Sequence, residues 1–402
     1  MREAEAKLLS EFSCALRGEK MILRFENGEE RLRFFHLAES HKILPMVMDA
    51  CANASDFPYY AKRAYWETIT QAQRSADFLL LYEYLKGKGL SPLILKGILC
   101  RSLYVNPEQR LSADEDFLID LEDVSRYHEA LLAYGLQPAD PAQDIRQAYE
   151  ITYTEKDSLL YLEVHTQLFP PSSAYSRLND LFANIRSRSI SEKVYSTDIR
   201  TLSCRDHLLY LILHAYKHFL YSGFGIRQCA DILLHSLHYQ NEIDWSSVKN
   251  DLVTAGAFDF SRAIYKIGLV HLLKTTSFLP EDWDICSIDE MPLLEDIMVS
   301  GLYGTSSFSR LHSSNITLHA MEESGKGSGV LRSIFLPLDS MKGKYPYLKK
   351  APFLLPYAWI QRIRTYVKES KQAHADDMLE SVKIGRGRVE LLKMYHMIPD
   401  KH

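Results

Sequence analysis

The chain has 402 residues, of which 46% are hydrophobic and 25% are charged, and its formal net charge is −5. These values are typical of a globular protein with enough residues for two or three compact units, and they argue against a protein that binds nucleic acid through its overall charge. The sequence has no run of about 18 uninterrupted apolar residues, and its first residues are too charged for a signal peptide, so we expect a cytoplasmic protein without a membrane partner.

The six cysteines are scattered and form no Cys-x-x-Cys pair, which argues against a zinc ribbon or a disulfide framework. We expect them to be reduced thiols that are mostly buried. They stand at Cys14, Cys51, Cys100, Cys204, Cys229 and Cys286.

Residues 1–88 are predicted to form helices, because apolar residues recur there at spacings of three and four. Leu8 and Phe12 belong to one such series, and Phe78 and Tyr82 to another. The segment Lys86-Gly-Lys-Gly is a helix stop, since glycine readily adopts the left-handed conformation that ends a helix. We therefore expect an N-terminal helical region over 1–88 and a separate core over 89–172, which holds the candidate site residues described next.

The core begins with a predicted strand at Leu93–Leu95, followed by Lys96 and Gly97 and then a helical stretch. A glycine between a strand and a helix lets backbone amides approach a phosphate, and the helix N-terminus adds partial positive charge. Lys96 and Gly97 are therefore candidates for phosphate binding. The alternative for Lys96 is an exposed lysine at the end of a strand.

Two carboxylates follow in Arg110-Leu-Ser-Ala-Asp-Glu-Asp-Phe-Leu-Ile. If this segment is a strand, Asp114 and Asp116 lie on one face about 7 Å apart, a spacing suited to divalent cations. An acidic turn in solvent would explain the pair if it stood alone, but it precedes an apolar strand, where unpaired charges are costly. Glu115 would point to the opposite face, which we expect to be partly solvated.

A helix is predicted over Asp123–Tyr134, with Asp120 or Asp123 as its cap and Gly135 as its end. A hairpin follows, with strands at residues 149–154 and 159–165 and a turn at 156–158. In the second strand Glu163 and His165 share one face, while Leu162 and Val164 face the core.

From about residue 175 onward the pattern is helical, with no convincing strand, so we expect a helical region over 173–402. A mobile loop is predicted near 304–329, which is rich in Ser, Gly and His. Between 332 and 393, Lys and Arg outnumber Asp and Glu by roughly seven, which indicates either a solvated helix surface or a site for a triphosphate or an acidic partner.

The order strand, Lys-Gly, helix, Arg, Asp-x-Asp, helix and hairpin with a further acid resembles the polymerase-beta-like nucleotidyltransferase superfamily. Three short motifs are similar to those of the family catalogued as uncharacterised nucleotidyltransferases. They are Leu95-Lys-Gly, Asp114-Glu-Asp-Phe-Leu-Ile and Glu163-Val-His. Weaker likenesses occur at Leu213-His214 and at Ile226 to Asp231, and in the C-terminal tail from Val382. The resemblance implies an α+β fold, a small mixed nucleotidyltransferase sheet backed by helices.

The same resemblance implies a magnesium-dependent transfer of a nucleoside monophosphate from an NTP, with ATP as the favoured donor, and release of pyrophosphate. Two Mg²⁺ ions are expected, with Mn²⁺ as an alternative, held by Asp114, Asp116 and Glu163. Lys96, Gly97 and Arg110 would contact the nucleotide. Members of the superfamily commonly have Gly-Ser at this turn, whereas this chain has Lys-Gly. The sequence therefore supports the phosphate-binding residues less strongly than it supports the metal ligands.

Two further residues have open roles. His165 would either orient a carboxylate or contact the acceptor, or else be a neutral structural histidine. Arg227 most simply pairs with Asp231 on a helix surface, with a place in the cleft as the alternative. A zinc site at His214 and His218 is disfavoured, because no third ligand lies nearby in the sequence.

The acidic overall charge favours a small molecule, or a peptide or protein, over RNA as the acceptor. The alternative to an enzyme is a catalytically degenerate scaffold that binds a nucleotide or a protein partner in the same cleft. An intact set of acids argues for the enzyme.

Overall fold

The computed structural model describes residues 1, 3–155, 158–171, 176–221, 223–300, 338–341, 345–349, 351–361 and 390–397. The predicted loop at 304–329, most of the basic stretch at 332–393, the tail motif up to 389 and the turn at 156–157 lie outside these residues.

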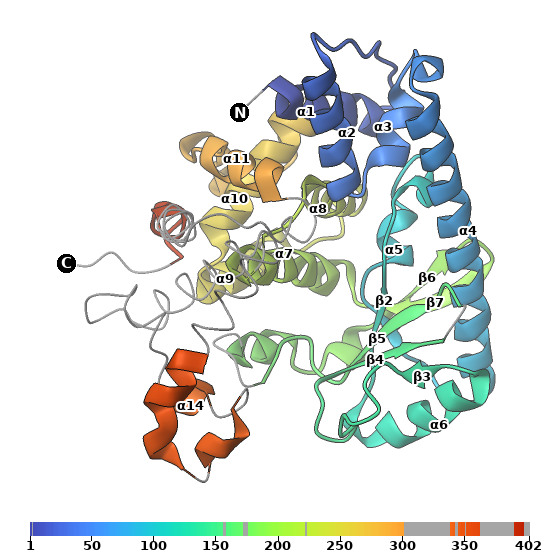
Figure 1. The fold of residues 1–402 in the computed structure, drawn as a ribbon, viewed down its shortest axis with the longest axis vertical. Helices are drawn as coiled ribbons and strands as arrows, with labels where there is room; N and C mark the ends of the chain where they lie inside the picture. Colours follow the sequence, from blue (N-terminus) through green and yellow to red (C-terminus); the bar gives the residue numbers. More distant parts are fainter. Residues whose placement is uncertain are drawn as a thin grey trace. The chain divides into compact units, whose positions relative to one another are not determined.

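The described chain is built from a seven-stranded sheet and many helices (Figure 1). This confirms the predicted α+β class. The strands are β1 (Leu93–Ile94), β2 (Glu115–Leu118), β3 (Gln137–Pro138), β4 (Glu150–Thr154), β5 (Tyr161–His165), β6 (Ile190–Val194) and β7 (Thr197–Thr201). The helices are α1 (Glu3–Leu16), α2 (Gly28–Ser40), α3 (Leu44–Ala50), α4 (Pro58–Gly87), α5 (Ile98–Arg101), α6 (Val124–Tyr134), α7 (Cys204–Tyr221), α8 (Ile226–His238), α9 (Trp245–Ala255), α10 (Phe258–Lys266), α11 (Met291–Ser300) and α14 (Leu338–Met341), with a π-helical turn at Ile267–Leu273.

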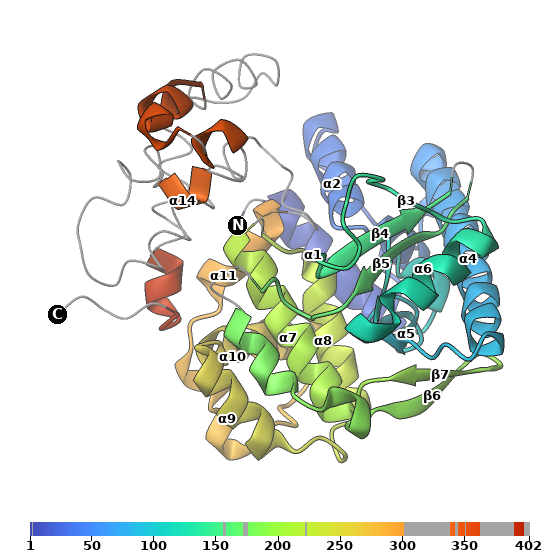
Figure 2. The ribbon, with the colours of Figure 1, turned by 90° about the horizontal axis from the view of Figure 1, so that it is seen from below.

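The sheet is mixed, and its strands run in the order β3-β4-β5-β2-β1-β7-β6. The predicted hairpin is confirmed as the antiparallel pair β4–β5, and β2 pairs with β5 in parallel. The prediction that no strand follows residue 175 is wrong, because β6 and β7 form a second hairpin (Figure 2). Strand β7 of this hairpin pairs with β1 in parallel. Both strands of the hairpin contain charged residues, and apolar and polar residues alternate little in them, so the sequence gives only a weak strand signal. Charged residues are common in strands at the edge of a sheet, where β6 lies.

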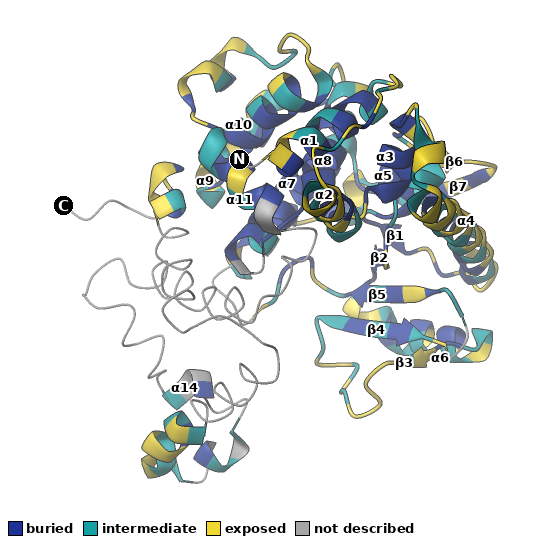
Figure 3. Ribbon diagram, turned by 45° about the horizontal axis from the view of Figure 1, so that its top comes forward, coloured by how far each residue is buried: buried dark blue, intermediate teal, exposed yellow. Residues whose placement is uncertain are grey.

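One face of the sheet carries the core that fixes the strands. Side chains from α4, α5 and α6, among them Phe78, Ile98 and Tyr127, form one buried cluster with Phe117 and Val164. Figure 3 shows the buried strands in dark blue, while the outer side of α4 is exposed. The opposite face of β2 and β5 is therefore the one available for polar side chains.

The predicted α6 helix is confirmed, and it ends at Gly135, whose φ of 110° lies in the left-handed region. Asp123 stands at its N-cap position, but no side-chain hydrogen bond caps the helix there, and the carboxylate pairs with Arg126 instead. Asp123 thus occupies the predicted position, but the prediction that its side chain caps the helix is wrong. Asp120 pairs with Arg186 and caps no helix either.

The chain divides into two compact units. The first comprises residues 1–214 and 226–291, and the second comprises 215–225 and 292–402. The predicted boundaries at residues 88 and 172 both fall inside the first unit. Within this unit the Ser13 hydroxyl of α1 donates to the carbonyl of Leu272, so segments far apart in sequence pack together. In the second unit, Met341, Leu348 and Ala358 form a small buried cluster.

All six cysteines are free thiols, and four of them are buried, as predicted. None of the helices in the described part of the chain combines the length and apolarity needed to cross a membrane.

Candidate functional site

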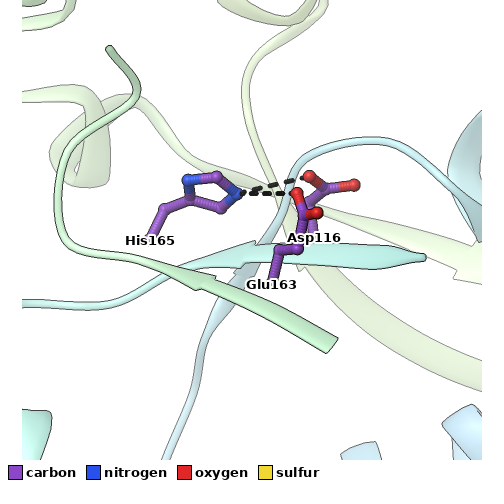
Figure 4. Close-up of side chains that lie close together, drawn as sticks. All are labelled: Asp116, Glu163 and His165. Atoms are coloured by element: carbon purple, nitrogen blue, oxygen red, sulfur yellow. Dashed lines mark hydrogen bonds and ion pairs between the residues drawn. The ribbon is translucent and has the colours of Figure 1, made fainter. Parts of the chain in front are cut away.

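Three polar side chains meet on the face of the sheet opposite the core (Figure 4). The parallel pairing of β2 and β5 sets Asp116 directly beside Glu163, and His165 follows on the same face of β5. His165 Nε2 lies 3.3 Å from Asp116 Oδ1 and 3.8 Å from Glu163 Oε2. One ligand atom from each of the three lies within 4.8 Å of the other two. The sheet thus brings together acids that are 47 positions apart in the sequence.

Two more predicted residues complete this group. Asp114 precedes β2, and its side chain is partly exposed. Lys96, which follows β1, points into the group, with its Nζ 3.1 Å from Asp116 Oδ1 and 4.0 Å from Asp114 Oδ2. We call Lys96, Asp114, Asp116, Glu163 and His165 the acid cluster.

The charges in the acid cluster shift one another strongly. Burial raises the pKa of Glu163 to about 8, and the neighbouring charge of Asp116 adds to this shift. Burial has the same tendency at Asp116, but Lys96 and His165 offset it and hold the pKa of Asp116 well below its usual range. The pKa of Lys96 is well above its usual value, because the charges of Asp116 and Asp114 outweigh its burial. A raised pKa means that the Glu163 carboxylate is stabilised by positive charge, which either a proton or a bound cation can supply.

The donor set fits a divalent cation of the magnesium class. Asp116 Oδ2 is buried and has no hydrogen-bond partner within the described residues, so it retains full capacity to bind a cation. Carboxylate oxygens are the ligands that Mg²⁺ prefers, and Asp114, Asp116 and Glu163 provide them. His165 adds a nitrogen, which Mn²⁺ tolerates better than Mg²⁺ does.

Glu115 corrects one expectation. It is completely buried, and its carboxylate pairs with Arg101 and accepts a hydrogen bond from the backbone of Ile98 at 2.9 Å. The face opposite Asp116 is therefore not solvated, because α5 covers it. Arg101 compensates for the buried charge.

The same contact gives Gly97 a structural role. Its φ of 64° and ψ of −111° are available only to glycine at low cost, and a Cβ atom there would overlap Glu115 Oε2. The amide at the start of α5 already has the Glu115 carboxylate as its acceptor. The geometry thus does not favour the predicted phosphate contact at Gly97.

Arg110 belongs to a buried network that has Asp231 at its centre. Its Nε and Nη2 donate to the two carboxylate oxygens of Asp231 at 3.0 and 2.6 Å, and the Tyr104 hydroxyl donates to the same carboxylate at 2.8 Å. Asp231 thus occupies Nε and Nη2, while Nη1 is buried and has no hydrogen-bond partner within the described residues. Because the fork that would hold a phosphate is already paired with a carboxylate, the geometry does not favour a phosphate role for Arg110 either. Sequence patterns could not indicate the pairing, because its partners are 121 residues apart.

Arg227 belongs to the same buried network. The prediction of an ion pair with Asp231 on a helix surface is wrong in its location, because both side chains are buried. The charge of Arg227 does help to lower the pKa of Asp231, after the larger effect of Arg110 has overcome burial. Arg110 is thus the main partner of Asp231.

Two residues of α7 adjoin the acid cluster: Tyr210, which sequence analysis missed, and His214, which it considered in the family likeness and as a disfavoured zinc ligand. His214 Nε2 lies 3.3 Å from Lys96 Nζ, and the Tyr210 ring packs against the His214 ring with centroids 5.4 Å apart. Burial raises the pKa of Tyr210 well above 10, so this side chain is a neutral phenol beside the acids. Their spacing of four places both on one helix face, and this was the available signal.

The comparisons with known proteins agree with this geometry. A family model described as uncharacterised nucleotidyltransferase matches residues 27–267, which is more than half of the chain. The chain belongs to this nucleotidyltransferase family. Membership supports transferase activity, and the matched residues include the whole acid cluster. The tail motif from Val382 lies beyond the match.

No curated protein and no solved structure matched the chain. The nucleotidyltransferase family therefore supplies the reaction class, and the arrangement of side chains must supply the detail.

Proposed function

We propose that this protein is a magnesium-dependent nucleotidyltransferase. It moves a nucleoside monophosphate from an NTP, with ATP as the favoured donor, to a hydroxyl or phosphate group of an acceptor, and it releases pyrophosphate. The acceptor is a small molecule or a peptide or protein in preference to RNA. The observation that carries the proposal is the pairing of Asp116 with Glu163 across parallel strands, in a chain that belongs to a nucleotidyltransferase family.

Asp114, Asp116 and Glu163 would hold the cation. When bound, a divalent ion neutralises charge on the phosphates and lowers the pKa of an attacking hydroxyl. Lys96 reaches the same space from β1 and contacts the phosphates of the donor, as its ammonium group already contacts two acids of the cluster. Of the three predicted nucleotide contacts, it is the one that the geometry favours.

Transfer forms a bond between the acceptor oxygen and the α-phosphorus and breaks the bond from that phosphorus to the bridging oxygen of pyrophosphate. Glu163 in its ionised form accepts the proton of the attacking hydroxyl. His165 positions the Asp116 carboxylate through their 3.3 Å contact. Tyr210 and His214 limit the freedom of Lys96 from the α7 side.

The test follows pyrophosphate release and transfer of an α-labelled nucleotide from each NTP in the presence of Mg²⁺, with sugars, serine peptides and RNA ends as acceptors. We expect transfer in the wild-type protein and in Asp123→Asn, which changes a nearby acid outside the acid cluster. Asp116→Asn and Glu163→Gln should give none. Binding of magnesium and NTP that is equally strong in all four proteins, without turnover, would instead identify a degenerate scaffold.

A further inference from the structure

A second feature lies at the strand ends that follow the acid cluster in sequence. At the carboxyl ends of the parallel strands β2 and β5, a pocket of about 400 Å³ is open to solvent. Its lining includes Leu118, Asp120, Gln167, Leu168, Phe182 and Arg186, and we call it the strand-end pocket. None of the roles proposed above uses these residues. Ligands in open α/β sheets commonly bind beyond the carboxyl ends of strands.

The strand-end pocket adjoins the acid cluster through the strand register. Leu118 is the direct neighbour of His165 across β2 and β5, and it follows Asp116 by two residues, on the same face. Phe117 belongs to the buried core on the other face, and Ile119, just after the end of β2, both joins that core and lines the pocket. The pocket thus begins immediately after the acids.

Lys96 lies toward the other end of β2. Strand β1 runs antiparallel to β2, and the Leu95 amide donates to the Asp116 carbonyl, so Lys96 stands beyond Asp116 on the side away from Leu118. Asp116 therefore separates Lys96 from the strand-end pocket along the strand. In phosphoryl transfer the attacking and leaving oxygens are roughly in line. With the triphosphate at Lys96, the strand-end pocket is on the side of the attacking group.

The lining of the pocket indicates the kind of acceptor. Leu168 and Phe182 are buried and provide an apolar wall. On the rim, Arg186 donates to Asp120 at 2.6 Å and to the Leu118 carbonyl at 3.1 Å, which holds the guanidinium in place. The Asp120 side chain remains 47% exposed, so a carboxylate oxygen can accept hydrogen bonds from a ligand. Gln167 is exposed beside it and offers an amide.

An apolar wall with carboxylate and amide groups on the rim suits a ring that has C–H faces and hydroxyl edges. The volume lies within the usual range for small-molecule sites, about 300–1,000 Å³, and is too small for a folded partner. We infer that the strand-end pocket binds the acceptor of the reaction, a small hydroxyl-rich molecule of the sugar class, with one hydroxyl directed at the acid cluster. This inference rests on the proposed nucleotidyl transfer.

The experiment measures binding of defined probes directly, because binding does not require turnover. Glucose, glucosamine and sucrose are each added to the full-length protein, and saturation-transfer NMR records contact and affinity. Two variants alter the pocket in different ways: Asp120→Asn removes the rim carboxylate, and Gln167→Trp fills the opening from an exposed position. Asp123→Asn is the matched control, since Asp123 lies close in sequence but does not line the pocket.

We expect at least one sugar to bind, with an affinity about tenfold lower in both pocket variants and unchanged in the control. Absence of binding by all three sugars, or equal binding by every variant, would overturn the inference. Transfer to a serine peptide or to an RNA end that both pocket variants leave unchanged would also overturn it. Titration of magnesium and NTP into the same proteins is read separately: a wild-type protein that binds no NTP counts against the proposed function, whereas normal NTP binding without sugar binding counts against the pocket alone.

Discussion

Replacement of Gly97 by alanine distinguishes a structural glycine from a phosphate-binding one. The new Cβ would overlap Glu115 Oε2 and lie 2.7 Å from Glu115 Cδ, so the carboxylate must leave its position. The glycine-only backbone conformation costs alanine about 1–3 kcal/mol. Loss of the hydrogen bond from Ile98 to the charged carboxylate adds about 1.5–3 kcal/mol. From the two contributions together we expect Gly97→Ala to lower the free energy of unfolding by roughly 2.5–6 kcal/mol.

The assay is urea unfolding followed by circular dichroism. Gly87→Ala is the matched control, because Gly87 ends α4 with open space around it and should be unchanged or slightly stabilised. A Gly97→Ala protein as stable as the wild type, but with weakened NTP binding, would refute the structural role and restore the predicted phosphate contact.

Four further results are expected. Asp116→Asn should abolish transfer while far-ultraviolet circular dichroism stays unchanged, and retained transfer would remove this acid from the site. Lys96→Ala should weaken NTP binding by about tenfold or more in calorimetry, and an unchanged affinity would exclude a phosphate contact. Arg110→Met should lower the free energy of unfolding by about 3–5 kcal/mol, because it leaves the buried Asp231 charge without its main partner; a loss below about 1 kcal/mol would contradict this. Burial lowers the pKa of His207 to about 4, whereas the pKa in the unfolded chain is about 6.5. The contribution of His207 to stability should therefore be fully present above about pH 6.5 and should be lost, by about 3 kcal/mol, as the pH falls toward 4. His207→Gln should flatten this pH dependence of the free energy of unfolding in urea, and an unchanged slope would refute the assignment to His207.

Local patterns were sufficient to predict the elements that carry the acids. The alternation in β5 and the turn before it predicted the β4–β5 hairpin, and the periodicity ending at Gly135 predicted α6. The spacing of Asp114 and Asp116 predicted a shared face, and the structure has both beside Lys96.

Contacts between distant segments could not be predicted in this way. Glu115 looked solvated because nothing in its own strand indicates that Arg101 would reach it from α5. Arg110 looked available because its partner Asp231 is 121 residues away. Tyr210 was hidden within an apolar helix, where an aromatic residue is ordinarily part of the core. In each case a buried charge or phenol acquired its role from packing that a single sequence does not contain.

The strand-end pocket illustrates the same limit. Alternation within β2 already places Leu118 on the face of Asp116, two residues earlier, but only the parallel register with β5 sets it beside His165. Register is a property of two strands, so neither strand alone could indicate it.

The most direct test of the central claim is calorimetric titration of ATP, GTP, CTP and UTP into the protein, with Mg²⁺ and with EDTA, repeated on the Asp114→Asn/Asp116→Asn double variant. The account predicts binding of one nucleotide that requires Mg²⁺ and is lost in the double variant. Binding that is equally strong in EDTA, or in the double variant, would contradict it.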